Sequence, residues 1–145
     1  MDAWSARRAA MVERDIAARG VRDARVLQAM RAVPRERFVP ARRLEEACAD
    51  HPLPIGAGQT ISQPYIVALM SEALQLHGGE RVLEIGTGSG YAAAVLSRLA
   101  REVHTVERIA SLAEAARRML AELQAANVQV HIGDGSLGWP ARSEE

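Results

Sequence analysis

The sequence predicts an α/β fold with a parallel sheet, and three observations point to it. An apolar run, Val82 to Ile85, leads into a glycine-rich segment, Gly86 to Gly90, and then into strong helix formers from Tyr91 to Ala100. Two further runs of strand-forming residues follow, at 103–107 and 128–132, with a helical pattern between them. Alternating strands and helices are typical of a parallel sheet, whose apolar strands are usually buried on both faces.

The glycine-rich segment predicts a tight turn at the carboxyl end of the first strand. Gly86, Gly88 and Gly90 allow positive φ angles and a close approach of the backbone to a ligand. Such a turn directs backbone N–H groups and the positive end of the following helix toward whatever binds above it. A Gly-x-Gly-x-Gly pattern alone is a weak signal, and a turn that only links a strand to a helix is the alternative.

The spacing of the glycines and the position of Glu84 indicate which ligand the turn favours. The dinucleotide pattern is Gly-x-Gly-x-x-Gly, whereas Gly90 arrives one residue earlier here. The Glu84 carboxylate at the strand end would repel a diphosphate and attract a cation. S-adenosylmethionine offers cationic groups to a carboxylate, so we favour it. A dinucleotide-dependent oxidoreductase is the alternative.

Composition limits the classes of partner and site. The 145 residues suffice for one domain, and 18 basic and 18 acidic residues cancel, so no net field favours nucleic acid or an anionic membrane. Cys48 is the one cysteine, and we interpret it as a small buried apolar residue and not as a nucleophile. No zinc-type spacing joins the four scattered histidines, so no metal site is predicted.

The chain shows no signal peptide pattern and no window approaching the ~20 apolar residues of a membrane span. A single cysteine fits a reducing compartment. We therefore expect a soluble, cytoplasmic protein.

Residues 1–76 are predicted to form a helical and loop cap. Residues 1–33 have the pattern of two helices broken at Gly20, and Pro34 stops the second helix. A loop-like stretch follows, with a short helical piece at 42–49. The rest of the chain, from residue 77 to 145, is predicted to form a partial cofactor-binding domain that makes one integrated unit with the cap.

Two features of the cap concern function. Arg31, Arg35 and Arg37 are compatible with an anion site, but a solvated basic face is the favoured interpretation. The polar segment 55–65 is followed by an apolar helical pattern, and a polar loop docked by such a helix can be held over the mouth of a pocket. The apolar positions of that helix are Ile66, Leu69, Met70, Ala73 and Leu74.

Four segments, in this order, resemble the protein-L-isoaspartate O-methyltransferase family. They are Pro34 to Pro40, Pro52 to Gly56, Gly58 to Tyr65 and Val82 to Tyr91. The glycine turn is common to many methyltransferases, whereas the Gly-Gln-Thr-Ile-Ser-Gln-Pro stretch resembles this family alone. The resemblance covers nearly the whole chain, but only about two-thirds of a complete enzyme of this type.

The resemblance implies a Rossmann-like class I S-adenosylmethionine-dependent methyltransferase fold with an N-terminal helical cap. It also implies protein repair: a methyl group passes from S-adenosylmethionine to the α-carboxyl of isoaspartyl residues in damaged proteins and peptides, leaving S-adenosylhomocysteine. A truncated, non-catalytic relative that binds the cofactor, or another class I methyltransferase, is the alternative.

The chemistry requires no strong base, because a carboxyl group with a pKa near ~4 is already ionised at neutral pH. Positioning and exclusion of water remain for the protein to supply. Thr60, Ile61 and Ser62 are suited to positioning through backbone N–H groups and a small hydroxyl. The resemblance implies that Ser62 is the active-site serine, whereas composition alone favours an ordinary loop hydroxyl.

The remaining candidates follow the strands. Glu107, at the end of the second strand, is the candidate acceptor for the ribose hydroxyls. Asp134 is the candidate acceptor for the adenine amino group, with the Gly135 N–H beside it, although a turn-forming role is the alternative. Tyr65 matches a cofactor contact of the family or packs in its loop. The predicted cofactor-binding set is Thr60, Ile61, Ser62, Tyr65, Glu84, Gly86, Gly88, Ser89, Glu107, Arg108, Asp134 and Gly135.

The end of the chain departs from the resemblance. Gly138 to Pro140 still fits, but 141–145 is polar where an apolar fourth strand is expected to begin and to pair with the first strand. The sheet is therefore expected to be incomplete. Val82 to Ile85 would then form an exposed apolar edge, which favours self-association.

Overall fold

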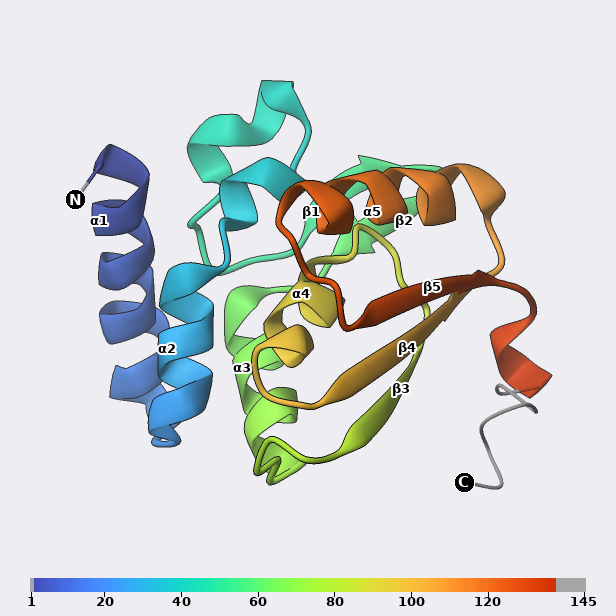
Figure 1. Ribbon diagram of the computed structural model, residues 1–145. Coiled ribbons are helices and arrows are strands. Elements are labelled where there is room, and N and C mark those ends of the chain that lie inside the picture. The colour runs from blue at the N-terminus through green and yellow to red at the C-terminus, as the bar shows by residue number, and fades with distance from the viewer. Residues whose placement is uncertain (1, 138–145) are drawn as a thin grey trace. The chain divides into compact units, whose positions relative to one another are not determined.

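The computed structural model describes residues 2–137, which belong to two compact units, Met1–His77 and Gly78–Glu145 (Figure 1). The last segment of the sequence prediction, from 138 to 145, lies outside the described residues. No helix within residues 2–137 is both long and apolar enough to cross a membrane.

The first unit begins with two helices, as the sequence predicts. Helix α1 (Ala3–Met11) continues through a π-helical turn, η1 (Val12–Ile16), and a 3-10 turn, η2 (Ala17–Arg19). Gly20 ends this run with a φ of 109°, and α2 (Ala24–Ala32) follows. Aspartates cap both helices, because Asp2 accepts the Ser5 N–H and Asp23 accepts the Arg25 N–H. The buried apolar side chains of this helical part are Met11, Val12, Ile16, Val21, Val26, Ala29, Met30 and Val33.

A β-hairpin stands where the sequence predicts a loop. Two 3-10 elements, η3 (Arg35–Phe38) and η4 (Ala41–Glu46), precede strands β1 (Leu53–Gly56) and β2 (Gln59–Ile61), which pair antiparallel. The turn between the strands has positive φ at residues 56–58, which reverses the chain within a few residues. The prolines beside β1 obscured this strand in the sequence.

Helix α3 (Pro64–Ala73) closes the first unit and begins with proline at its first turn. Its buried residues are Pro64, Val67, Ala68 and Ser71, and it packs on α2 and η1. The apolar positions that the sequence pattern predicts for this helix lie on its opposite side. The large apolar side chains on that side are more than one-third exposed: Ile66, Leu69, Met70 and Leu74.

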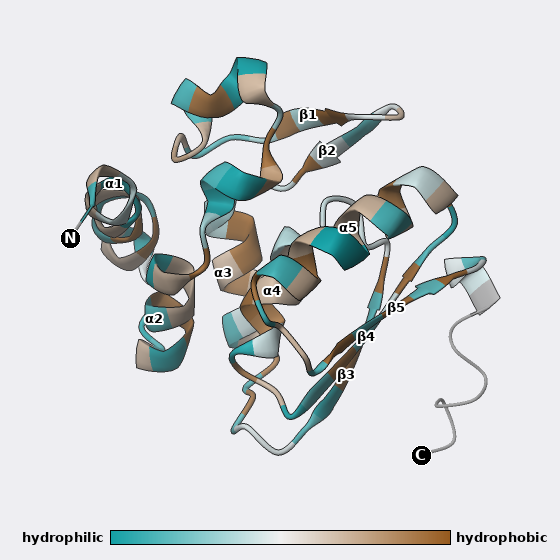
Figure 2. Ribbon diagram, turned by 45° about the horizontal axis from the view of Figure 1, so that its top comes forward, coloured by the Kyte–Doolittle hydropathy of each residue, from teal (hydrophilic) through white to brown (hydrophobic). Residues whose placement is uncertain are grey.

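The second unit is a three-stranded parallel sheet in the order β3-β4-β5, which confirms the predicted α/β class. The strands are β3 (Arg81–Ile85), β4 (Glu102–Glu107) and β5 (Val128–Ile132). Helices α4 (Tyr91–Ser97) and α5 (Ala110–Glu122) connect them and cover one face of the sheet, and a 3-10 turn, η5 (Gly135–Leu137), follows β5 (Figure 2).

The strands differ in how deeply they are buried. Residues 103–107 of β4, the central strand, are all buried. In β3, at an edge of the sheet within the described residues, Leu83 is 43% exposed and Ile85 is 51% exposed. The prediction that this strand is covered on both faces is therefore wrong, because the two side chains on one of its faces are largely exposed. Among residues 2–137, β3 is an edge strand with exposed apolar side chains, as the sequence predicts.

Candidate functional site

The turn after β3 has the backbone geometry that its glycines allow. Gly86, Gly88 and Gly90 have φ angles of 89°, 55° and 93°. The Gly86 N–H donates to the carbonyl of Val106, and the Gly90 N–H donates to the carbonyl of Thr87. The turn is thus fastened both to itself and to the end of β4.

Glu107 lies beside this turn and is only 6% exposed. Its Oε1 accepts the Gly88 N–H at 2.9 Å, and its Oε2 accepts the Ile109 N–H at 3.0 Å. A carboxylate oxygen has two lone pairs, so each oxygen keeps capacity for one more donor. The structure therefore brings the predicted ribose acceptor directly against the glycine turn.

Glu84 is half-buried on β3, beside β4. It pairs in register with Thr105, whose Oγ1 donates to Glu84 Oε1 at 2.6 Å, and Thr105 Oγ1 lies 2.6 Å from Thr87 Oγ1. Burial raises the pKa of Glu84 to about 7; the Thr105 hydrogen bond opposes this rise, and the negative Glu107 adds to it. Glu84 is therefore protonated in part of the population at neutral pH.

Asp134 and Gly135 follow β5, at the same carboxyl edge of the sheet. Asp134 Oδ1 accepts the Ser136 hydroxyl at 2.7 Å and the Ser136 N–H at 2.9 Å, and these bonds lower the pKa of the exposed Asp134 carboxyl. A Cβ at Gly135 would lie 2.3 Å from Cγ2 of Ile85, so any larger residue there would force the Ile85 side chain to shift. The end of β5 thus approaches the end of β3, and Arg108 is exposed after β4.

The segment that carries Ser62 belongs to the first unit and is held by Arg35. The Arg35 side chain is fully buried and donates to the carbonyls of Ala47 at 2.8 Å, Ser62 at 2.8 Å and His51 at 3.2 Å. The interpretation of Arg35 as part of a solvated basic face is therefore wrong, because backbone carbonyls replace water around its guanidinium. Arg31 and Arg37 are exposed, as expected.

A second anchor, Asp50, holds the other side of the same segment. Its Oδ1 accepts the Tyr65 N–H at 2.9 Å, and its Oδ2 accepts Gln63 Nε2 at 3.0 Å and Arg19 at 2.9 Å. The Arg19 guanidinium lies 3.8 Å from the centroid of the Tyr65 ring. Tyr65, in the first turn of α3, thus packs against Arg19, while the Ser62 side chain is exposed between the two anchors.

The predicted residues therefore form two groups, one in each unit. In the first unit Thr60 and Ser62 are exposed, whereas the Ile61 side chain is buried, so that only its backbone is available to a ligand. In the second unit the predicted residues all lie in or after the carboxyl ends of the strands. They are Glu84, Gly86, Gly88, Ser89, Glu107, Arg108, Asp134 and Gly135.

Two histidines that the sequence presents as scattered are neighbours on the sheet. The parallel register of β4 and β5 brings His104 and His131 together, with stacked rings whose centroids are 5.2 Å apart and Nδ1 of His104 2.9 Å from Nε2 of His131. His104 Nε2 contacts the Glu102 carboxylate. Among residues 2–137, no group of three or more His, Cys, Asp or Glu side chains is arranged to hold a metal ion.

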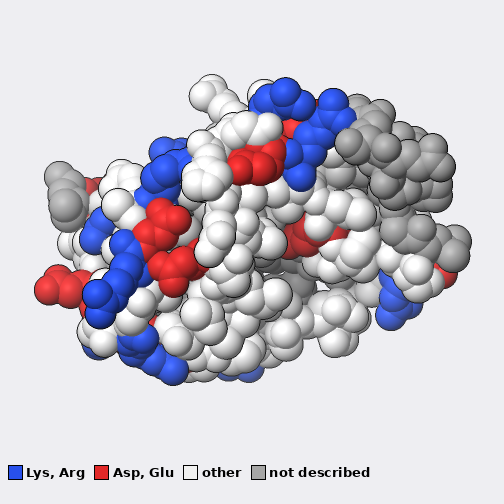
Figure 3. Space-filling view, turned by 90° about the horizontal axis from the view of Figure 1, so that it is seen from below, with Lys and Arg blue, Asp and Glu red and all other residues white. Residues whose placement is uncertain are grey.

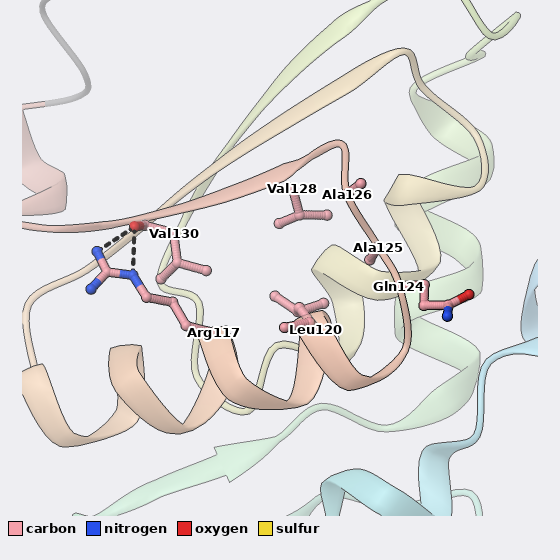
Figure 4. A pocket seen from close by; sticks show the side chains of 8 residues that line it. Arg117, Leu120, Gln124, Ala125, Ala126, Val128 and Val130 are labelled. Carbon is pink, nitrogen blue, oxygen red and sulfur yellow. Dashed lines mark hydrogen bonds between the residues drawn. The ribbon is translucent and has the colours of Figure 1, made fainter.

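A pocket of about 330 Å³ lies elsewhere in the second unit, between α5 and β5 (Figure 4). Its lining is mostly aliphatic, and the Arg117 guanidinium donates to the Val130 carbonyl at 2.6 and 3.1 Å. None of the predicted site residues lines this pocket. Acidic and basic side chains are interspersed on the face drawn in Figure 3.

Comparison with known proteins decides between the ligand classes that the turn leaves open. A sequence model described as Protein-L-isoaspartate(D-aspartate) O-methyltransferase matches residues 6–144. The chain belongs to the protein-L-isoaspartate O-methyltransferase family. Protein-L-isoaspartate O-methyltransferase 1 of Rhodopseudomonas palustris strain HaA2 is 65% identical over 137 residues, which are 94% of this chain and 56% of that protein.

Solved structures of this family have the same fold. A protein-L-isoaspartate O-methyltransferase with 33% identity aligns with a TM-score of 0.83 over 96% of this chain and 45% of its own. A Plasmodium falciparum protein described as a putative family member, in complex with S-adenosyl-L-homocysteine, aligns at 24% identity with a TM-score of 0.71, over 85% of this chain and 61% of its own. The predicted Rossmann-like class I methyltransferase fold is therefore confirmed. The chain spans 55 to 63% of the length of the curated relatives it matches.

Sequence reasoning found the acidic residues at the strand ends but missed the residues that hold the Ser62 segment. Arg35 and Asp50 make contacts with segments more than ten residues away, so no local pattern marks them. The Thr87 and Thr105 hydroxyls were also missed. Side chains alternate between the two faces of β4, so Thr105 and Glu107 lie on the same face. This alternation is the sequence signal that points to Thr105.

Proposed function

We propose that this chain takes part in S-adenosylmethionine-dependent methylation of the α-carboxyl of isoaspartyl residues in damaged proteins. The observation that carries the proposal is the carboxyl edge of the sheet. Glu84 and Glu107 lie at the carboxyl ends of two adjacent strands and Asp134 follows the third, and Glu107 contacts the glycine turn, in a chain of this methyltransferase family. Ligands of α/β folds bind at this edge.

The residues at this edge fit S-adenosylmethionine better than a dinucleotide. Glu107 is buried and Glu84 is half-buried, and the donors that reach them within the described residues are neutral hydroxyl and N–H groups. Two carboxyl groups in such a position favour a ligand with an ammonium and neighbouring hydroxyls, and they repel a diphosphate. The relative from Plasmodium falciparum holds S-adenosyl-L-homocysteine.

Each residue of the edge has a role in this proposal. Glu84 binds the cationic amino-acid part of the cofactor, and Glu107 accepts the ribose hydroxyls. Asp134 accepts the adenine amino group with its second oxygen, since Oδ1 is engaged by Ser136. When bound, the cofactor supplies an activated methyl group. The remaining proposed contacts on this side are Gly86, Gly88, Ser89, Arg108 and Gly135.

Ser62 is proposed to position the carboxyl group that receives the methyl group. Its exposed hydroxyl donates a hydrogen bond to the incoming carboxylate, while Arg35 and Asp50 hold the backbone on either side. No general base is needed, because the carboxyl group arrives ionised. Thr60, Ile61 and Tyr65 complete the proposed cofactor contacts of this segment.

The Ser62→Ala variant should reduce methyl transfer by at least about tenfold, because one positioned donor to a reacting carboxylate is lost. Its affinity for S-adenosylhomocysteine should change by less than about twofold, since the hydroxyl acts on the acceptor. Single-turnover transfer and calorimetry measure the two quantities. Ser111→Ala, at an exposed serine of α5, is the matched control. Equal losses of transfer and affinity in Ser62→Ala would contradict this role.

The proposed function is tested by transfer of a radiolabelled methyl group from S-adenosylmethionine to an isoaspartyl peptide, beside its aspartyl twin. We expect label in the isoaspartyl peptide alone. Calorimetry with S-adenosylhomocysteine and with NAD accompanies the assay. Binding of S-adenosylhomocysteine without transfer would contradict catalysis by this chain and would identify it as a cofactor-binding relative. Binding of NAD instead would contradict the cofactor assignment.

We also propose that the chain associates with itself through β3, because an exposed apolar edge strand favours pairing with a second chain. Sedimentation velocity should then show mass that rises with protein concentration. Leu83→Glu should abolish the rise, since a charge on β3 disfavours strand pairing. Leu44→Glu, at an exposed leucine of η4, should leave it unchanged. A monomer at every concentration would contradict this proposal.

We propose the cytoplasm as the compartment of the protein. Cys48 is a free cysteine in a buried position, and burial raises the pKa of its thiol. A buried, unreactive thiol is consistent with the predicted packing role and suits a reducing environment.

A further inference from the structure

Two hydroxyl groups connect Glu84 to the glycine turn. Thr105 is fully buried and Thr87 is 4% exposed. Thr87 Oγ1, Thr105 Oγ1 and Glu84 Oε1 form a chain in which each step is 2.6 Å. Thr105 and Glu84 are register partners on adjacent strands, and Thr87 belongs to the turn itself.

This chain of hydroxyls satisfies Glu84 in both of its protonation states. A carboxylate only accepts hydrogen bonds, so Thr105 then donates to Glu84 and Thr87 donates to Thr105. A protonated carboxyl donates to Thr105, which in turn donates to Thr87. Rotation of two hydroxyls converts one arrangement into the other. No side chain has to move, and Glu84 keeps a hydrogen-bond partner in each state.

The surroundings of Glu84 make the protonated state accessible. Glu107 on β4 is the charged group that acts on Glu84, and its like charge disfavours ionisation of Glu84. Among the buried residues of α4, the helix after the turn, the titratable one is Tyr91, whereas the buried residues of α5 are all apolar. A cationic ligand at the turn would therefore be the counter-charge that the Glu84 carboxylate lacks within the described residues.

We propose that Thr105, together with Thr87, is a positioning residue that couples loss of a proton from Glu84 to binding of the ligand's cationic group. The inference rests on the proposed function, because it takes the ligand to be the aminoacyl nucleoside assigned above. With the site empty, Glu84 is protonated in part of the population at neutral pH, and the protonated form donates to Thr105. On binding, the proton leaves to the buffer, and Thr105 donates to the carboxylate.

Calorimetry with S-adenosylhomocysteine, in buffers of different ionisation enthalpy between pH 6 and 8.5, tests the coupling in the purified chain. We expect proton release on binding near neutral pH, and affinity that falls about tenfold per pH unit at the acid end. Thr105→Val should move this profile to higher pH, because the carboxylate loses its donor. Thr105→Ser keeps the hydroxyl and should restore the profile of the unmodified chain. Glu84→Gln should bind weakly and without dependence on pH.

A titration without ligand separates this inference from the proposed function. The Glu84 carboxyl carbon, observed by carbon-13 NMR, should titrate at a higher pH in Thr105→Val and at an unchanged pH in Thr105→Ser. Identical titration of Glu84 in all three proteins would overturn the role of Thr105, even if the cofactor binds. Absence of S-adenosylhomocysteine binding at every pH would overturn the proposed function, and the titration would still decide the role of Thr105. Thr87→Val gives a second test should Thr105→Val fail to fold.

Discussion

The Arg35→Met variant should lose about 3–5 kcal/mol of folding free energy, because breaking a buried, charged hydrogen-bond network leaves its partners unpaired. Arg35 supplies donors to the carbonyls of Ala47, His51 and Ser62, and methionine supplies none. A loss of this size approaches the whole stability of a small domain. We therefore expect the first unit of the variant to be largely unfolded at room temperature.

Chemical denaturation followed by circular dichroism measures this loss, and hydrogen exchange of the Tyr65 amide reports on the Ser62 segment. Arg37→Met is the matched control, because Arg37 is an exposed arginine of the same 3-10 element. Its stability should change by less than about 0.5 kcal/mol. Equal denaturation midpoints for the two variants would show that the buried guanidinium does not hold the segment.

Glu84 should make the chain less stable as the pH rises. Because its pKa is raised from 4.5 to about 7 by burial, the folded state binds this proton more tightly than the unfolded state does. The contribution of this proton to the free energy of unfolding is fully present below pH 4.5 and is lost as the pH rises through about 7. The difference between the two pKa values corresponds to about 3 kcal/mol. Glu84→Gln, which cannot ionise, should lack this loss.

Denaturation of both proteins at a series of pH values isolates the effect, since all other titrating groups are common to them. The stability of Glu84→Gln relative to the unmodified chain should increase by about 3 kcal/mol between pH 4.5 and pH 8. Glu45→Gln, where the side chain is 91% exposed, should show no such trend. A constant difference between Glu84→Gln and the unmodified chain across this range would rule out a proton-binding Glu84.

The parallel sheet was predictable because its signals are local. Apolar strands, the glycine turn and the helical spacing of α5 each lie within a short window, and β5 begins and ends at the predicted residues. The hairpin β1-β2 was not predictable in the same way. Its strands have three or four residues, and its proline and glycine content is typical of loops.

The site residues divide in the same way: those marked by a local sequence pattern were predicted, and those defined by contacts with distant segments were not. Glu84 and Glu107 were found because strand ends carry the ligands of α/β folds. Arg35 looked like a surface residue, since burial of an arginine depends on carbonyls that other segments provide. His104 and His131 looked unrelated until the register of two strands placed their rings in contact.

The fixed position of the Glu107 side chain affects how tightly the carboxyl edge of the sheet binds a ligand. Its two oxygens are fixed by the Gly88 and Ile109 amides before any ligand arrives. The rotational freedom of this side chain is therefore lost once, when the protein folds, and not again at each association. Shortening it to aspartate would keep the charge yet release at least one amide. The resulting loss of affinity would be entropic in origin.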